Sequence, residues 1–231
     1  LATDQKAASS NLDEISDYDY IAGLKSFQDG MYQIQDISSM LAGEYTAPKA
    51  GDTIVDVCGA PGGKSINAAL KMSEQGDCGR VIARDLSDYK VALIDENIKR
   101  LNITNIQTQV YDALDCDESL INKADIVIAD LPCSGLGIIG RKPDIKYNAS
   151  PEKLQSLVDL QRDILKVVSR YVKSGGVLMY STCTINRAEN EDNADWICKE
   201  SGFTKDGEYH QLLPANNSGM DGFFVARLIK S

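Results

Sequence analysis

The 231-residue sequence contains no long apolar run, no CxxC pair and only one histidine. A membrane-spanning helix needs about 20 consecutive apolar residues, so we expect no membrane segment. Structural zinc sites use closely spaced cysteine pairs, so we expect no metal. The first residues form neither a basic nor an apolar region, which argues against a signal peptide. These absences predict a cytoplasmic protein whose six cysteines stay reduced.

An excess of basic charge is also missing, because 34 acidic residues outnumber 24 basic ones and the net charge is −10. Taken alone, this balance argues against a nucleic-acid-binding protein. The charge is uneven, however, since the segment from Arg141 to Lys173 has more basic than acidic residues. Such a strip can follow a phosphate backbone, although its 153–173 part fits the solvated face of a helix better.

Short apolar runs alternate with helical patterns from about residue 48 to the C-terminus. Strands are expected at 53–57, 81–86, 106–111, 126–129, 177–180 and 223–229, and helices at 31–47, 64–72, 87–101, 151–172 and 190–200. Repeated β-α-β units predict an α/β fold with a mostly parallel sheet and helices on both faces. Gly175-Gly176 is expected to end the helix that Pro151 begins. Residues 1–47 are predicted to form a helical or linker extension, and residues 48–231 the main domain.

A glycine-rich loop, Cys58-Gly59-Ala60-Pro61-Gly62-Gly63-Lys64-Ser65, follows the first expected strand and precedes a helix. A P-loop NTPase would need glycine at position 58, and the dinucleotide pattern GxGxxG is also broken. S-adenosylmethionine enzymes use a looser loop together with an acidic residue at the end of the second strand, where Asp85 stands. Asp112 and Asp130 follow later strands in the same way. The loop therefore favours S-adenosylmethionine, with a P-loop-like NTPase as the alternative.

Two cysteines each follow an apolar run that reads as a buried strand. Cys133 lies in Asp130-Leu131-Pro132-Cys133-Ser134-Gly135, and Cys183 lies in Tyr180-Ser181-Thr182-Cys183-Thr184. Ligands bind at the carboxyl ends of the strands in open parallel sheets. Two thiols at that edge indicate covalent chemistry.

These segments together resemble the RNA (cytosine-5)-methyltransferases, most closely the bacterial Sun/RsmB ribosomal RNA enzymes. The resemblance runs from about Gln33 to the C-terminus and also includes segments 141–146 and 221–224. It implies a Rossmann-like methyltransferase fold with a mostly parallel seven-stranded sheet, in which residues 48–231 form the catalytic domain. The implied substrate is RNA, of the small ribosomal subunit. Family members also carry an N-terminal RNA-binding domain, so we expect this chain to be part of a longer protein, and a monomer.

The resemblance also implies a role for individual residues. Cys183 is the implied nucleophile that adds to C6 of cytosine, Asp130 the group that binds the base, and Cys133 a helper in product release. His210 is a candidate for the base that removes the C5 proton only by residue type. A non-catalytic RNA-binding module with the same fold remains the alternative. Contacts to S-adenosylmethionine are implied for Cys58, Gly59, Ala60, Pro61, Gly62, Gly63, Lys64, Asp85, Lys90, Asp112 and Asp130.

Overall fold

The structure, a computed structural model, describes residues 20–76, 79–214 and 220–231. In these residues one sheet has the strand order β3-β2-β1-β4-β5-β8-β6, with β7 paired to β8 outside this path. Strands β1 to β5 pair in parallel, and β8 runs antiparallel to β5, β6 and β7. The strands are β1 (Thr53–Asp56), β2 (Arg80–Asp85), β3 (Ile106–Val110), β4 (Ala124–Asp130), β5 (Val172–Thr182), β6 (Phe203–Lys205), β7 (His210–Leu212) and β8 (Phe223–Lys230).

The predicted mostly parallel sheet is therefore confirmed, but it has eight strands in the described part of the chain rather than seven. The two strands that the sequence pattern did not predict, β6 and β7, have only three residues each. Such short segments carry too few alternations for a periodicity to be recognised.

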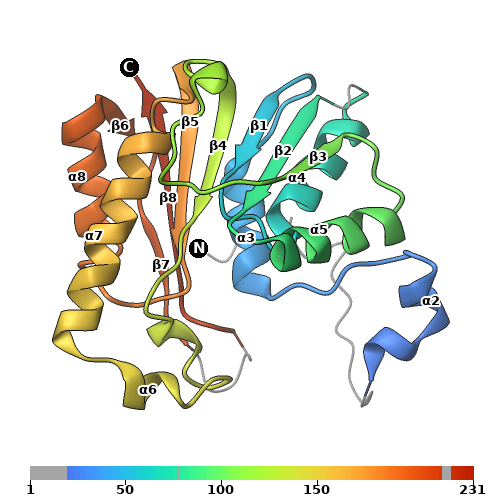
Figure 1. Ribbon diagram of the computed structural model, residues 1–231, viewed down its shortest axis with the longest axis horizontal. Coiled ribbons are helices and arrows are strands. Elements are labelled where there is room, and N and C mark those ends of the chain that lie inside the picture. Colours follow the sequence, from blue (N-terminus) through green and yellow to red (C-terminus); the bar gives the residue numbers. More distant parts are fainter. Residues whose placement is uncertain (1–19, 77–78, 215–219) are drawn as a thin grey trace.

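Helices cover both faces of the sheet, with α7 and α8 on one face and α3 and α4 on the other (Figure 1). Neighbouring residues of β1 separate the two cores, because Val55 packs in the core with α7 and α8 and Ile54 packs in the other. This alternation is the period of two that a strand imposes. The helices are α2 (Lys25–Gln28), α3 (Ile37–Thr46), α4 (Gly63–Glu74), α5 (Asp88–Arg100), α6 (Ile145–Asn148), α7 (Pro151–Val168) and α8 (Glu191–Ser201).

The first long helix begins later than predicted. A helix was expected from residue 31, but α3 begins at Ile37, because the side chain of Asp36 caps it and accepts a hydrogen bond from the Ser38 backbone N–H at 2.9 Å. Helix α3 packs on α4 and β8, so this part of the extension is attached to the sheet. The first 19 residues of the extension lie outside the described residues, and the division at residue 47 stays a prediction.

The Gly175-Gly176 pair does not end a helix, which corrects the prediction. Helix α7 ends at Val168, and β5 starts at Val172 and continues through both glycines. Gly175 has a φ of +74°, and the pairing of β4 with β5 shifts register between Ala124 and Ile126. The glycines therefore belong to an irregularity inside a long strand, where a left-handed conformation is needed.

The central strands β4 and β5 bring the segments that carry Asp130, Cys133 and Cys183 together. Strands β4 and β5 are parallel neighbours, with Asp130 opposite Ser181. The loops that carry Cys133 and Cys183 therefore leave the same edge of the sheet side by side. No helix in the described part of the chain is long and apolar enough to cross a membrane.

Candidate active site

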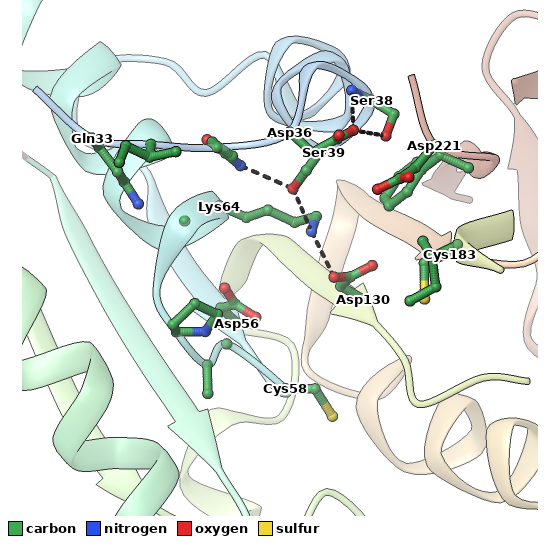
Figure 2. Close-up of a pocket in the computed structure, with 18 residues that line it drawn as sticks. Gln33, Asp36, Ser38, Ser39, Asp56, Cys58, Lys64, Asp130, Cys183 and Asp221 are labelled. Atoms are coloured by element: carbon green, nitrogen blue, oxygen red, sulfur yellow. Dashed lines mark hydrogen bonds and ion pairs between the residues drawn. The ribbon is translucent and has the colours of Figure 1, made fainter. Parts of the chain in front are cut away.

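A cavity of about 340 Å³ lies at the carboxyl ends of β1, β4 and β5 (Figure 2). Six separate segments of the chain contribute to it: the start of α3 with the residues before it, the end of β1 with the glycine loop, the end of β4, the turn at Ile138, the residue after β5, and the start of β8 with the residues before it. The lining residues are Gln33, Ile34, Gln35, Asp36, Ser38, Ser39, Asp56, Cys58, Gly59, Ala60, Pro61, Gly63, Lys64, Asp130, Ile138, Cys183, Asp221 and Phe223.

Lys64 connects the glycine loop to Asp130 across the cavity (Figure 2). Its Nζ lies 2.6 Å from Asp130 Oδ2 and donates to Ser39 Oγ at 3.1 Å. The other carboxylate oxygen of Asp130 accepts a hydrogen bond from Ser181 Oγ at 2.6 Å. Both oxygens of Asp130 are therefore bonded, and the direction of the carboxylate is fixed by groups from two different segments.

The two cysteines are in direct contact. Cys133 Sγ and Cys183 Sγ are 3.2 Å apart. The hydrogen bond from the Cys133 thiol lowers the pKa of Cys183, and the positive charge of Lys64 acts in the same direction. The same bond, together with burial, raises the pKa of Cys133. A thiolate is the reactive form of cysteine, so the lower pKa of Cys183 fits the expectation that it is the nucleophile of the pair, which stays a prediction.

The glycine loop is held in place by the end of β2. Asp85, which is 3% exposed, accepts a hydrogen bond from the Ala60 N–H at 3.1 Å and forms an ion pair with Lys90 at 3.0 Å. Asp112 instead accepts a hydrogen bond from the Leu114 N–H in the turn after β3. Four of the residues expected to contact a cofactor are thus outside the described cavity lining: Gly62, Asp85, Lys90 and Asp112. Their cofactor contacts stay predictions.

Asp56, at the end of β1, is a cavity residue that the sequence pattern did not single out. Its carboxylate is buried, and Oδ2 accepts a hydrogen bond from Ser65 Oγ at 2.6 Å. Oδ1 has no hydrogen-bond partner among the described residues. A Cβ at Gly59 would lie 3.2 Å from this carboxylate, so the glycine there leaves it room. Its position as an acidic residue at the end of the first strand is the sequence feature that could have identified it as a site residue.

Asp56 gives the fold a specific pH dependence. Burial raises the pKa of this carboxyl from 3.8 to about 6, against the opposing effect of the Ser65 hydrogen bond. Between these values the native state binds a proton that the unfolded state has released, so the stability contributed by Asp56 is lost as the pH rises through that range. The shift corresponds to a change of about 3 kcal/mol.

We therefore expect Asp56→Asn, which cannot titrate, to gain stability relative to the unmodified protein as the pH rises from 4 to 6.5. Denaturant unfolding curves measured at several pH values check this expectation. Asp159→Asn, an exposed site on α7, serves as the control. A difference in unfolding free energy between Asp56→Asn and the unmodified protein that does not change with pH would contradict the assignment.

Arg141 joins two carboxylates at the mouth of the cavity. It forms ion pairs with Asp36, at the start of α3, and with Asp221, at 3.2 Å. Burial raises the pKa of Asp221, and the negative charge of Asp36 adds to this effect. Arg141 thereby links two of the segments that line the cavity, the one before α3 and the one before β8. The sequence placed Arg141 and Asp221 in family-like segments but did not predict their contact.

His210 lies on β7, where its ring stacks on Tyr45 with centroids 4.2 Å apart. Of the described residues that line the cavity, none is a histidine. The structure therefore gives His210 no place beside the two cysteines.

Comparison with known proteins shows to which family this chain belongs. The family model described as 16S rRNA methyltransferase RsmB/F matches residues 44–229. The probable ribosomal RNA small subunit methyltransferase B of Bacillus subtilis is 38% identical over 229 residues, which cover 91% of this chain and 50% of that protein. The ribosomal RNA small subunit methyltransferase F of Escherichia coli O157:H7 is 33% identical, with 87% of this chain and 45% of that protein covered.

Solved structures agree with this assignment. NSun6 from Pyrococcus horikoshii, determined with SFG, has a TM-score of 0.80 at 28% identity, covering 91% of this chain and 56% of that one. A methyltransferase homologue from the same organism has a TM-score of 0.79 at 25% identity, covering 92% of this chain and 72% of that one. The chain spans about half the length of the curated relatives it matches. With a family match over most of its length, the chain belongs to the 16S rRNA methyltransferase RsmB/F family.

Proposed function

We propose that the protein transfers a methyl group from S-adenosylmethionine to C5 of a cytosine in RNA of the small ribosomal subunit, in the cytoplasm and as a monomer. The contact between Cys133 and Cys183, 3.2 Å apart beside the cavity, is the observation that carries this proposal. C5 of cytosine is itself a poor nucleophile, and attack by a cysteine at C6 turns it into one that can take a methyl group. The names of the relatives support ribosomal RNA as the substrate.

S-adenosylmethionine is the cofactor, and it supplies an electrophilic methyl group on a sulfonium. The cavity joins the glycine loop to Cys183 and Asp130, so a ligand held by the loop lies next to the reacting groups. The unpaired Oδ1 of Asp56 offers an acceptor to the amino group of the methionine part. Burial raises the pKa of Cys58, so this residue stays a neutral thiol in the wall of the site.

Methylation begins with covalent attack. The Cys183 thiolate adds to C6 of the cytosine, a carbon–sulfur bond forms, and N3 takes up a proton. We assign the N3 edge of the base to Asp130, which contacts Lys64 and Ser181 and which, if it is protonated as the base binds, donates that proton to N3. The resulting enamine makes C5 nucleophilic, so C5 takes the methyl group and S-adenosylhomocysteine leaves. The target base must be unstacked to enter the cavity.

Release of the product reverses the first step. The C5 proton passes to a base, the C5–C6 double bond forms again, the carbon–sulfur bond breaks, and N3 returns its proton. Cys183 leaves as a thiolate, and the Cys133 thiol 3.2 Å away stabilises that negative charge through its hydrogen bond. This gives Cys133 a physical role in release that matches the role implied by the family.

The P-loop alternative fits the site poorly. Lys64, the residue that would hold a phosphate, forms a 2.6 Å ion pair with Asp130 and is 9% exposed. A phosphate would have to displace this carboxylate before Lys64 could bind it. The ion pair therefore favours the methyltransferase over the NTPase.

The proposal is tested by incubating the protein with S-adenosylmethionine and unmethylated small-subunit ribosomal RNA, followed by digestion of the RNA to nucleosides and mass spectrometry. We expect 5-methylcytidine to appear in proportion to enzyme and time. A methyl group on another base or on the ribose would overturn the assignment of C5.

Asp130→Asn tests the proton transfer to N3. The amide cannot donate as an acid, so we expect kcat to fall by about 10² to 10⁴, the usual contribution of acid–base catalysis. Methyl incorporation from labelled S-adenosylmethionine measures this loss. Asp163→Asn on the exposed part of α7 is the matched control, expected to keep full activity. A fall of less than tenfold in Asp130→Asn would argue against the role.

A further inference from the structure

Behind the two cysteines lies a polar cluster that the mechanism above does not use. Its members Gln161, Glu189, Asn190 and Asn193 are all 0% exposed. Burying amide and carboxylate groups without hydrogen bonds is costly, so their partners fix their positions closely. None of the four is among the described residues that line the cavity. Their role is therefore one of support rather than direct contact with substrate.

Two members of this cluster hold the peptide groups on either side of Cys133. Gln161 Nε2 donates to the carbonyl of Pro132 at 2.9 Å. The Ser134 N–H donates to Glu189 Oε2 at 2.8 Å. Gln161 Nε2 also donates to the same Glu189 oxygen at 3.1 Å, so the two supports are joined to each other. The backbone on both sides of Cys133 is thereby fixed to buried groups on α7 and just before α8.

The same carboxylate also connects to the loop that follows Cys183. Asn186 Nδ2 donates to Glu189 Oε1 at 2.9 Å. The Ser134 and Thr184 hydroxyls form a second connection between the two loops, with oxygens 2.7 Å apart. Glu189 thus lies where the Cys133 loop and the Cys183 loop meet.

We propose that Glu189 is a positioning residue that holds the Cys133 thiol in hydrogen-bonding contact with Cys183, with Gln161 as its partner. The proposal rests on the function proposed above for the importance of this contact, but the contact itself can be measured without RNA. It assigns a role in the reaction to a side chain that touches neither cofactor nor cytosine.

The chemistry of Glu189 makes a carboxylate necessary. All three partners of its two oxygens are N–H donors, from Ser134, Gln161 and Asn186. A glutamine at this position has one amide NH₂ group, which faces at least one of these donors whichever way the amide is turned. A buried donor opposed to a donor is left unsatisfied, and the local structure shifts to relieve it. In Glu189→Gln we therefore expect the Cys133 loop to move away from Cys183.

The test is the alkylation of Cys183 by iodoacetamide as a function of pH, in the whole protein and without RNA, followed by mass spectrometry of the Cys183 peptide. Loss of the Cys133 hydrogen bond leaves Cys183 more fully protonated, because that bond is what lowers its pKa. We expect alkylation near pH 7 in Glu189→Gln to slow by about tenfold, because a smaller fraction of Cys183 is then present as the reactive thiolate. Glu200→Gln, at an exposed site on α8, the helix that follows Glu189, is the matched control and should leave the profile unchanged.

Glu189→Asp provides the conservative rescue. It keeps an acceptor-only carboxylate on a shorter side chain, so its alkylation profile should lie between those of the unmodified protein and Glu189→Gln. It also supplies the measurement if Glu189→Gln does not fold. In a methylation assay, both variants should lose kcat while KM for S-adenosylmethionine changes little.

The outcomes separate positioning from a merely structural role. An unchanged Cys183 profile in a folded Glu189→Gln protein would overturn the proposal, even if activity fell. An unchanged profile in Glu189→Asp would overturn it if Glu189→Gln does not fold. A shifted profile in a protein that does not methylate cytosine would keep the positioning role and reject the proposed function instead.

Discussion

We expect Cys183→Ala to abolish methyl transfer to RNA while S-adenosylmethionine still binds. The substitution removes the sulfur that we propose forms the bond to C6, so C5 should not become nucleophilic. We expect a loss on the order of 10⁴-fold or more, as when the nucleophile of other covalent enzymes is removed. The glycine loop, Lys64 and Asp56 are untouched, so cofactor affinity should change little. Transfer of labelled methyl groups and equilibrium binding of S-adenosylmethionine measure the two quantities separately.

Cys198→Ala is the matched control for this experiment. Cys198 is a half-buried free cysteine on α8, away from the cavity lining. It should retain full activity, which separates the loss of a nucleophile from the general effect of removing a thiol. Methylation by Cys183→Ala at more than a few per cent of the normal rate would show that Cys183 is not the nucleophile.

Cys133→Ala should produce the second large effect, the accumulation of a covalent complex with RNA. The departing Cys183 thiolate loses the hydrogen bond from a thiol 3.2 Å away and becomes a poorer leaving group. Addition to C6 becomes slower as well, because the same bond lowers the pKa of Cys183 in the free enzyme. Most of the protein should migrate with RNA on a denaturing gel after long incubation, and product formation should nearly stop.

The double variant Cys133→Ala with Cys183→Ala is the control for this complex. Since we propose that Cys183 forms the bond to C6, the double variant should give no complex that survives denaturation. Normal multiple turnover by Cys133→Ala, or a stable complex with the double variant, would contradict the roles given to the two thiols.

The sequence predicts the parts of this molecule that depend on local pattern. Alternating apolar and helical segments were enough to predict a mostly parallel sheet with helices on both faces. Asp130, Cys133 and Cys183 each follow an apolar strand, and parallel strands deliver such residues to the same edge. The helix expected at 87–101 is α5, which begins where the Ser87 hydroxyl accepts a hydrogen bond from the Lys90 N–H.

The features that escaped prediction depend on contacts between distant segments. The partners of Lys64 are Ser39 and Asp130, which lie 25 and 66 residues away in sequence. The buried Asp56 side chain is held by a hydrogen bond from Ser65 on α4, a contact that no periodicity reports. Glu189, which holds the Cys133 loop, is bonded to Gln161 and to Ser134, which lie 28 and 55 residues away in sequence. Only the folded chain reveals these pairs.

The direct test of covalent catalysis by Cys183 is to identify the cysteine that becomes bonded to the base. RNA in which the target cytosine carries fluorine at C5 allows attack and methyl transfer, but fluorine cannot leave as a cation and the final elimination is blocked. The trapped complex can then be digested and its cross-linked peptide sequenced by tandem mass spectrometry. We predict that the nucleotide is attached to Cys183; attachment to Cys133, or no adduct in protein that methylates ordinary RNA, would contradict the mechanism.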